Sequence, residues 1–182
     1  MLKNIIFILT IILTSCYSGL KISKKERLVL NKNFNATVGN SASIIKSKNV
    51  KHQTLLEAFH IQEIPALNKK IATGVDSVKI YFKDSTLNLY YEANEHIGSH
   101  SFKGYFTEKG FFEINTFNDK INIPPILPIL YSSHYIDRIR VGLTKNGEIW
   151  VNTFFDNTKN IFFLVSGGIS NQTYYFNYKN AL

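Results

Sequence analysis

Two histidines have the spacing that comes nearest to a metal site. His96 and His100 lie four residues apart, and Glu92 precedes them. Zinc takes imidazole and carboxylate ligands from proteins, but this spacing brings two rings together only on a helix. Gly98 and the strand-like residues around it indicate a loop instead. We therefore name His96 and His100 as the metal-ligand candidates, expect a polar connection exposed to solvent there, and predict no metal or other cofactor.

The residue types of a hydrolase triad occur together in one short stretch. Ser132, Ser133, His134 and Asp137 could supply a nucleophile, a base and an orienting acid. In hydrolases these groups come from separate elements, whereas here they are neighbours in the sequence. The chain also lacks the G-x-S-x-G elbow that exposes a nucleophilic serine. We expect a surface turn at this place, and we predict that the protein is not an enzyme.

Arg138 and Arg140 alternate with apolar residues, which predicts that both guanidinium groups lie on one face of a strand. Two guanidinium groups on one face could bind an anion. Such a pair is more often part of the solvated face of an antiparallel strand. Both interpretations stay open at this point.

The first fifteen residues have the layout of a secretory signal peptide. Lys3 precedes an apolar run from Ile5 to Leu13, broken only by Thr10, and small polar residues follow. A membrane-spanning helix needs about 20 mostly apolar residues, and this run is shorter. We therefore expect residues 1–15 to be cut away.

The end of this run resembles the lipobox of bacterial lipoproteins. Leu13, Thr14, Ser15 and Cys16 give an aliphatic residue, two small residues that fit the signal peptidase, and a cysteine. The resemblance implies cleavage before Cys16, a diacylglycerol on its sulfur and usually a further acyl chain on the new amino group. Two or three acyl chains make spontaneous release from a bilayer negligible. Because Cys16 is the only cysteine, no thiol would remain for a disulfide or a metal site.

The resemblance also guides the expected location and partners. Tyr17 follows the cysteine, where the lipoprotein sorting rule places an Asp to retain a protein at the inner membrane, and no acidic run follows. This favours the outer membrane, on its periplasmic side. The formal net charge of +8 and the pI of about 9.5 would otherwise suggest nucleic acid. An envelope location excludes that partner.

A group of cations follows the lipidation site. Anionic lipid headgroups could attract these side chains, or their mutual repulsion could keep a solvated linker extended. We expect residues 16–51 to hold the lipidated cysteine, a tether and the approach to the domain, and residues 52–182 to form one β-rich globular domain. The cations are Lys21, Lys24, Lys25 and Arg27.

Hydrophobic periodicity predicts one short helix followed by strands. Apolar residues share a helical face over residues 53–64, and Pro65 stops any continuation. After Gly74, apolar and polar residues alternate and turn signals recur. Asn146-Gly147 is typical of a type I′ hairpin turn. The predicted strands cover residues 78–82, 87–91, 102–106, 111–114, 138–143, 148–151, 161–165 and 174–176.

The predicted fold class is mainly β. Sequential hairpins indicate an antiparallel meander of about eight strands with one short N-terminal helix. Strands in such number most often close into a barrel or pack as a two-sheet sandwich, which hides their edges. Residues 123–128 hold three prolines and are expected to form an extended crossing, since proline cannot donate to a ladder.

Three pieces between Ser101 and Gly168 resemble small lipoproteins of Gram-negative bacteria that have no assigned activity. The pieces begin at residues 102, 126 and 138 and read Phe-Lys-Gly-Tyr-Phe, Ile-Leu-Pro-Ile-Leu-Tyr-Ser and Arg-Ile-Arg-Val-Gly-Leu-Thr-Lys-Asn-Gly. This resemblance covers about half of the mature chain and implies no catalytic residue.

Our leading hypothesis is a non-enzymatic, lipid-tethered β-rich domain that binds or scaffolds another envelope component. One alternative is a small β-barrel that carries an apolar ligand. Another is an immunity lipoprotein that blocks a toxin from a competing cell.

Overall fold

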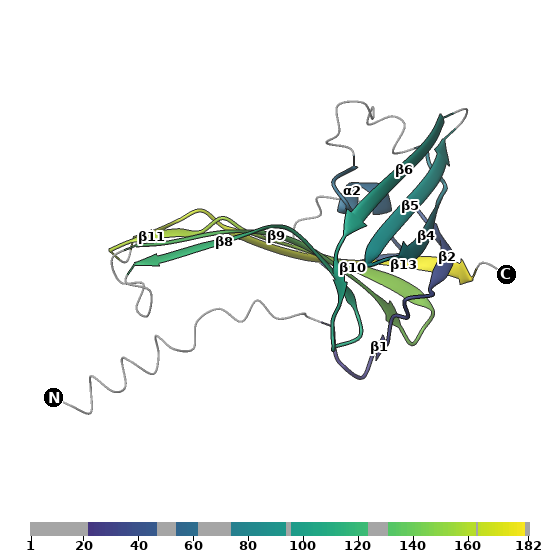
Figure 1. Ribbon diagram of the computed structural model, residues 1–182, viewed down its shortest axis with the longest axis horizontal. Helices are drawn as coiled ribbons and strands as arrows, with labels where there is room; N and C mark the ends of the chain where they lie inside the picture. The colour runs from purple at the N-terminus through teal and green to yellow at the C-terminus, as the bar shows by residue number, and fades with distance from the viewer. Residues whose placement is uncertain are drawn as a thin grey trace.

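A bent antiparallel sheet with a projecting arm makes up most of the described chain (Figure 1). The computed structural model describes residues 22–46, 54–61, 74–93, 96–123, 131–162 and 164–180. This part of the chain is mainly β with one short helix, which confirms the predicted fold class at that level. It holds thirteen strands rather than about eight, because residues 22–46 add three strands and the predicted strands 102–106 and 161–165 are each divided between two.

The elements are numbered in chain order. They are β1 (Arg27–Leu28), β2 (Asn35–Gly39), β3 (Ile44–Lys46), α2 (Leu55–Ala58), β4 (Ser77–Lys83), β5 (Thr86–Ala93), β6 (His96–Lys103), β7 (Tyr105–Phe106), β8 (Phe112–Ile123), β9 (Tyr131–Thr144), β10 (Glu148–Asp156), β11 (Lys159–Ile161), β12 (Leu164–Ser166) and β13 (Ile169–Asn180).

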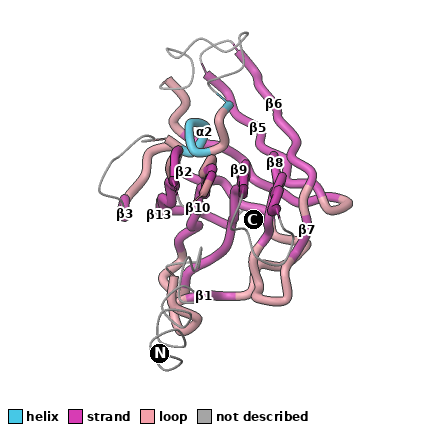
Figure 2. The backbone as a smooth tube through the Cα atoms, turned by 90° about the vertical axis from the view of Figure 1, so that its left-hand side faces the viewer, coloured by secondary structure: helices cyan, strands magenta, loops and turns pink. Residues whose placement is uncertain are grey.

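The sheet has two portions that share β13. Strands β8, β9, β10 and β13 form the long portion, while β2, β4, β5 and β6 form the upper portion, named for its place in Figure 1. β13 pairs with β10 over most of its length and with β2 at its end. Figure 2 looks along the long portion and shows the upper portion rising beside α2. The main path runs from β12 to β6 without closing, so the described sheet is not the closed barrel that was one of our two expectations.

The main core fills the space between the two portions and α2. Each portion contributes one face of its strands, and α2 contributes its whole buried turn. Burial of one large apolar side chain is worth about 1.5–3 kcal/mol. With a single cysteine in the chain, this packing and not a disulfide must stabilise the fold. Core members include Phe112, Ile139, Val151, Tyr174, Leu87, Leu89 and Leu55.

Backbone turns occur where residues adopt positive φ. Asp84 and Ser85 have φ values of 48° and 59°, and they connect β4 to β5 as a two-residue type I′ turn. The type I′ prediction at Asn146-Gly147 is wrong. Only Gly147 has a positive φ there, 76°, and it ends a three-residue loop that starts at Lys145. Glycine is favoured at this position of such loops because the position is left-handed.

α2 is shorter than the predicted helix over residues 53–64, both ends of which lie outside the described residues. A capping box begins it: Glu57 N donates to Thr54 Oγ1 at 3.2 Å, and Thr54 N donates to Glu57 Oε2 at 3.1 Å. Asn40 then joins the helix to the sheet, because its Oδ1 accepts a hydrogen bond from Leu56 N at 3.2 Å. These hydrogen bonds therefore fix the N-terminal end of α2 to the sheet.

Other sequence predictions also fall outside the described residues. They include the signal peptide, the lipobox residues Leu13, Thr14, Ser15 and Cys16, and residues 124–128 of the proline-rich crossing. No helix among the described residues is long and apolar enough to cross a bilayer. Residues 22–46, which we assigned to the tether and approach, hold β1, β2 and β3 in the sheet.

Candidate functional site

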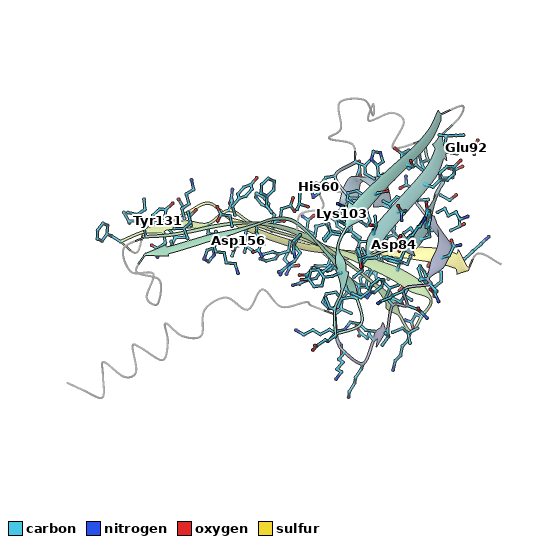
Figure 3. The ribbon with its side chains drawn as sticks, in the orientation of Figure 1. His60, Asp84, Glu92, Lys103, Tyr131 and Asp156 are labelled. Carbon is cyan, nitrogen blue, oxygen red and sulfur yellow. The ribbon has the colours of Figure 1, made fainter. Side chains whose placement is uncertain are left out.

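An arm of four neighbouring extended segments projects from the long portion of the sheet. We define the arm as residues 117–123, 131–137, 155–161 and 164–170. β8 and β9 supply the first two of these segments. β11 continues β10 along the same edge of β9, and β12 continues β13 beside β11. Figure 3 shows Asp156 near the middle of the arm and Tyr131 towards its far end. No other described element is stacked on the arm in Figure 1.

One face of the arm continues the face that lines the core. Ile139 and Val141 of β9 belong to the core, and Tyr135 lies on the same side because side chains alternate along a strand. The strand registers place residues of four other strands on this side too. The apolar residues of this side, which we call the apolar arm face, are Phe117, Ile121, Tyr135, Phe155, Ile161 and Leu164, and the same registers place Asp119, Asp137 and Lys159 among them.

The apolar arm face is largely exposed in the described structure. The exposed fractions are 54% for Phe117, 44% for Tyr135 and 77% for Leu164. The Tyr135 ring meets the rings of Phe117 and Phe155 edge-on, at centroid distances of 5.2 and 5.8 Å, so an aromatic strip crosses three strands. A cluster of exposed aromatic and aliphatic side chains of this kind is typical of binding sites.

The far end of the arm carries no formal charge. Residues 121–136 and 160–178 contain no Asp, Glu, Lys or Arg. β12 is the outermost strand of the main path, and its Leu164 and Val165 are both exposed. Monomeric proteins usually protect such an edge with charged residues. An uncharged apolar edge therefore favours contact with another molecule.

A buried charge cluster lies where the arm meets the long portion, on the opposite face of the sheet. Arg140 Nε donates to Glu113 Oε2 at 2.7 Å, and the Tyr105 hydroxyl donates to Glu113 Oε1 at 2.6 Å. Arg138 Nη1 lies 3.9 Å from the same Oε1. Two guanidinium groups thus face one carboxylate, and the cluster has a net positive charge.

The electrostatics of the cluster follow from burial and pairing. Burial alone would raise the pKa of Glu113, but hydrogen bonds from Tyr105 and Arg140, with the charges of both arginines, outweigh it and lower that pKa. The hydrogen bond to Glu113, followed by burial, raises the pKa of Tyr105. Burial, followed by the charge of Arg140, lowers the pKa of Arg138. These directions keep Glu113 ionised and Tyr105 protonated at neutral pH.

The shared face of Arg138 and Arg140 is confirmed, but it is not solvated. Arg140 is only 8% exposed, and the rings of Phe111 and Phe154 lie 5.7 and 5.0 Å from the guanidinium carbons of Arg140 and Arg138. The reason is Glu113 on the neighbouring strand, which faces the pair. Arg138 Nε and Arg140 Nη1 are buried without a hydrogen-bond partner in the described structure. The cluster thus has more donors than Glu113 uses.

The two metal-ligand candidates lie in β6, so the expected loop is wrong. Its ladder with β5 includes both His96 and His100. A strand rises about 3.3 Å per residue, which places the two backbones about 13 Å apart, whereas zinc–nitrogen bonds are about 2 Å long. His100 Nε2 lies 3.1 Å from the Tyr91 hydroxyl, and burial lowers the pKa of His100. No group of three or more potential metal ligands occurs in the described part of the chain.

The triad candidates are divided between the two faces of β9, in place of the expected turn. Ser132 and His134 share one face, and Ser133 and Asp137 share the other. His134 Nδ1 lies 3.4 Å from Asp156 Oδ2, an acid that the sequence did not suggest. No hydrogen bond joins either serine hydroxyl to the His134 ring among these described residues. The strand therefore does not assemble a nucleophile with its base.

A cleft of about 270 Å³ lies near the start of the described chain. Two lysines and two glutamates line it, so no net charge selects an ion there. The lining is Lys25, Glu26, Ile44, Thr144, Lys145, Asn146, Glu148 and Tyr175.

No protein-family model, curated protein or solved structure matches this chain. The apolar arm face and the charge cluster are therefore the features on which a function can be based. Sequence reasoning missed the arm, Glu113 and Tyr105. The available signal for Glu113 was its place in the predicted strand 111–114, but the register that pairs it with Arg140 depends on the fold.

Proposed function

We propose that this chain is a non-enzymatic binding module of the bacterial envelope, anchored through lipid on Cys16, whose arm binds another envelope protein. The apolar arm face carries the proposal, because it continues a core-lining face beyond the elements that cover the core. Each Å² of apolar surface removed from water is worth about 25 cal/mol. A partner that covers Phe117, Tyr135 and Leu164 would gain this stabilisation.

The charge cluster adds a second recognition element at the root of the arm. The Arg138 side chain is 18% exposed, against 10% for Arg140, and its nearest Glu113 oxygen is 3.9 Å away. Arg138 is therefore the better candidate for contact with a carboxylate, which would approach from the face of the sheet opposite the apolar arm face. Arg140 is already hydrogen-bonded to Glu113.

The apolar-carrier alternative receives less support. A carrier needs a lined cavity between its sheets. Here Phe112, Tyr174 and Leu55 are fully buried in the space between the two portions. An immunity lipoprotein remains compatible with the proposal, since a toxin would then be the protein bound by the arm.

Site-specific cross-linking in cells tests the binding role. Tyr135 is replaced by the photoreactive benzoylphenylalanine in the anchored protein, and we expect one discrete protein adduct after illumination. The matched control is Tyr90, which is 39% exposed on β5, close to the 44% of Tyr135. Adducts at both positions, or at neither, would contradict a binding role for the arm.

Radiolabelled palmitate tests the anchor separately. The native chain should incorporate label and partition with membranes, and Cys16→Ser should do neither. Unlabelled native protein would contradict lipidation whatever the cross-linking result.

A further inference from the structure

The first described residue is fixed to the domain. Ile22 is 5% exposed and packs against Phe111, Trp150 and Tyr175, on the face of the long portion opposite the main core. Cys16 precedes Ile22 by six residues. Six residues reach at most about 20–22 Å even when fully extended. With lipid on Cys16, this end of the domain must therefore stay within that distance of the bilayer.

Three segments come together at this end. Lys145 N donates to Glu26 O at 3.0 Å, and Leu30 N donates to Gly110 O at 3.0 Å. β1 also pairs with the last residues of β9. We call residues 23–29, 108–110 and 145–147 together the basal surface. Figure 1 shows β1 at the lower end of the molecule, below the level of the arm.

The basal surface combines cations with exposed apolar side chains. It holds four exposed lysines and a half-buried arginine against two exposed glutamates. Val29 is 78% exposed and Leu28 is 43% exposed between them. The charged residues are Lys24, Lys25, Arg27, Lys109, Lys145, Glu26 and Glu108.

We propose that the basal surface docks on the anionic headgroups of the membrane that holds the anchor. The inference rests on the proposed lipidation of Cys16, which keeps this surface near the bilayer. Each cation close to an anionic membrane strengthens binding about five-fold. Val29 and Leu28 lie among these cations, where apolar side chains can enter the headgroup region. The short tether and the net positive charge of the basal surface both favour an anionic lipid surface as its binding partner.

This orientation has a consequence for the arm. The arm and the basal surface lie at different ends of β9, since Tyr131 is near the arm's far end and Thr144 pairs with Arg27. Docking through the basal surface therefore leaves the apolar arm face free for a protein partner.

Vesicle co-sedimentation tests the docking surface without the anchor. The mature chain from residue 16, carrying Cys16→Ser, is mixed with vesicles of phosphatidylcholine alone or with phosphatidylglycerol added. We expect binding only to the anionic vesicles. The binding should be lost at about 1 M salt, where the screening length falls to about 3 Å.

Charge reversal identifies the surface. Lys25→Glu with Lys145→Glu should weaken binding to anionic vesicles at least about twenty-fold, given about five-fold for each lost cation. The control reverses Lys79 and Lys179, which are exposed on the outer side of the upper portion and flank Thr37 in the ladder. The control should bind as the unsubstituted chain does.

The inference would be overturned by equal binding to neutral and anionic vesicles, or by equal loss of binding in the two charge-reversed chains. Should Lys25→Glu with Lys145→Glu fail to fold, Lys24→Glu with Lys109→Glu makes the same test on exposed side chains. Palmitate labelling and Tyr135 cross-linking report on the anchor and the arm independently. Failure of the chain that carries only Cys16→Ser to bind anionic vesicles would therefore refute the docking surface as well, and it would leave the proposed function standing.

Discussion

Arg140 and Glu113 face each other across the β8–β9 ladder, and Arg140 Nε donates to Glu113 Oε2 at 2.7 Å. The pair is buried, and it lies just before β8 shifts its register between Asn115 and Phe117. A buried charge is tolerated only when its partner is in place. We therefore infer that this pair fixes the alignment of β8 at the root of the arm.

Removal of Glu113 should destabilise the fold strongly. Glu113→Ala leaves Arg140 and Arg138 buried without their carboxylate, and breaking such a pair costs about 3–5 kcal/mol. Urea denaturation should show a fall of that size in the free energy of unfolding. Glu108→Ala, at an exposed carboxylate, should change it by less than about 0.5 kcal/mol. Equal effects at the two positions would show that the Glu113 cluster contributes no special stability.

Glu113 should also give the protein an acid-sensitive stability. Its pKa lies below the ordinary value of 4.5, so the unfolded chain binds this proton at a higher pH than the folded protein does. The contribution is complete above about pH 4.5 and declines as the pH falls towards the folded pKa. We expect the difference in unfolding free energy between the native chain and Glu113→Gln to be constant from neutral pH down to that point. Below it the difference should narrow, and a difference that grows in acid would contradict the assigned direction.

Local signals predicted hairpins well, and distant pairings poorly. The β4–β5 and β9–β10 hairpins lie at the predicted positions, because a short loop fixes which strands meet. The next predicted hairpin, residues 102–106 with 111–114, is right only in part: residues 105–106 pair with β8 as β7, while residues 102–103 belong to β6. The pairing of β13 with β2 joins segments at opposite ends of the chain, and no local pattern indicates it.

The candidate site was harder to predict than the strands. Alternation placed Arg138 and Arg140 on one face, but their burial depends on Glu113 of β8. Likewise, Tyr135 and Ile139 have the same alternation in sequence. One is exposed and the other buried because the upper portion covers only part of β9. Which part of a strand lacks a cover is a property of the whole fold.

Trp150 provides an optical test of the packing beneath Ile22. A Cβ on Gly142 would lie 2.3 Å from the Trp150 ring, so Gly142→Ala must displace the indole. Overpacking of this kind costs about 1–3 kcal/mol. Trp150 is the only tryptophan, so both its emission wavelength and the unfolding midpoint should shift. Gly168→Ala is the control, since nothing lies within 4 Å of its Cβ position, and an identical response from both variants would contradict the close contact.

Zinc should not stabilise the protein through the two histidines of β6. Their backbones are about 13 Å apart in an extended strand, and the His100 ring already contacts the Tyr91 hydroxyl. Thermal unfolding with and without Zn²⁺ should give the same Tm, and His96→Ala should leave that result unchanged. A rise in Tm with Zn²⁺ that His96→Ala or His100→Ala abolishes would establish the metal site that this geometry argues against.

Two leucines separate the binding role of the arm from the stability of the fold. Leu89 is 0% exposed in the main core, and Leu164 is 77% exposed on the apolar arm face. Leu89→Ala should therefore lower the free energy of unfolding by about 2–5 kcal/mol, while Leu164→Ala should change it by less than about 0.5 kcal/mol. If Leu164 contacts a partner, Leu164→Ala should instead reduce the yield of the Tyr135 cross-link, as expected for an anchor residue at an interface. Should Leu164→Ala destabilise the isolated protein as much as Leu89→Ala does, the arm face would be covered within the chain itself. No exposed apolar surface on the arm would then remain for a partner to bury.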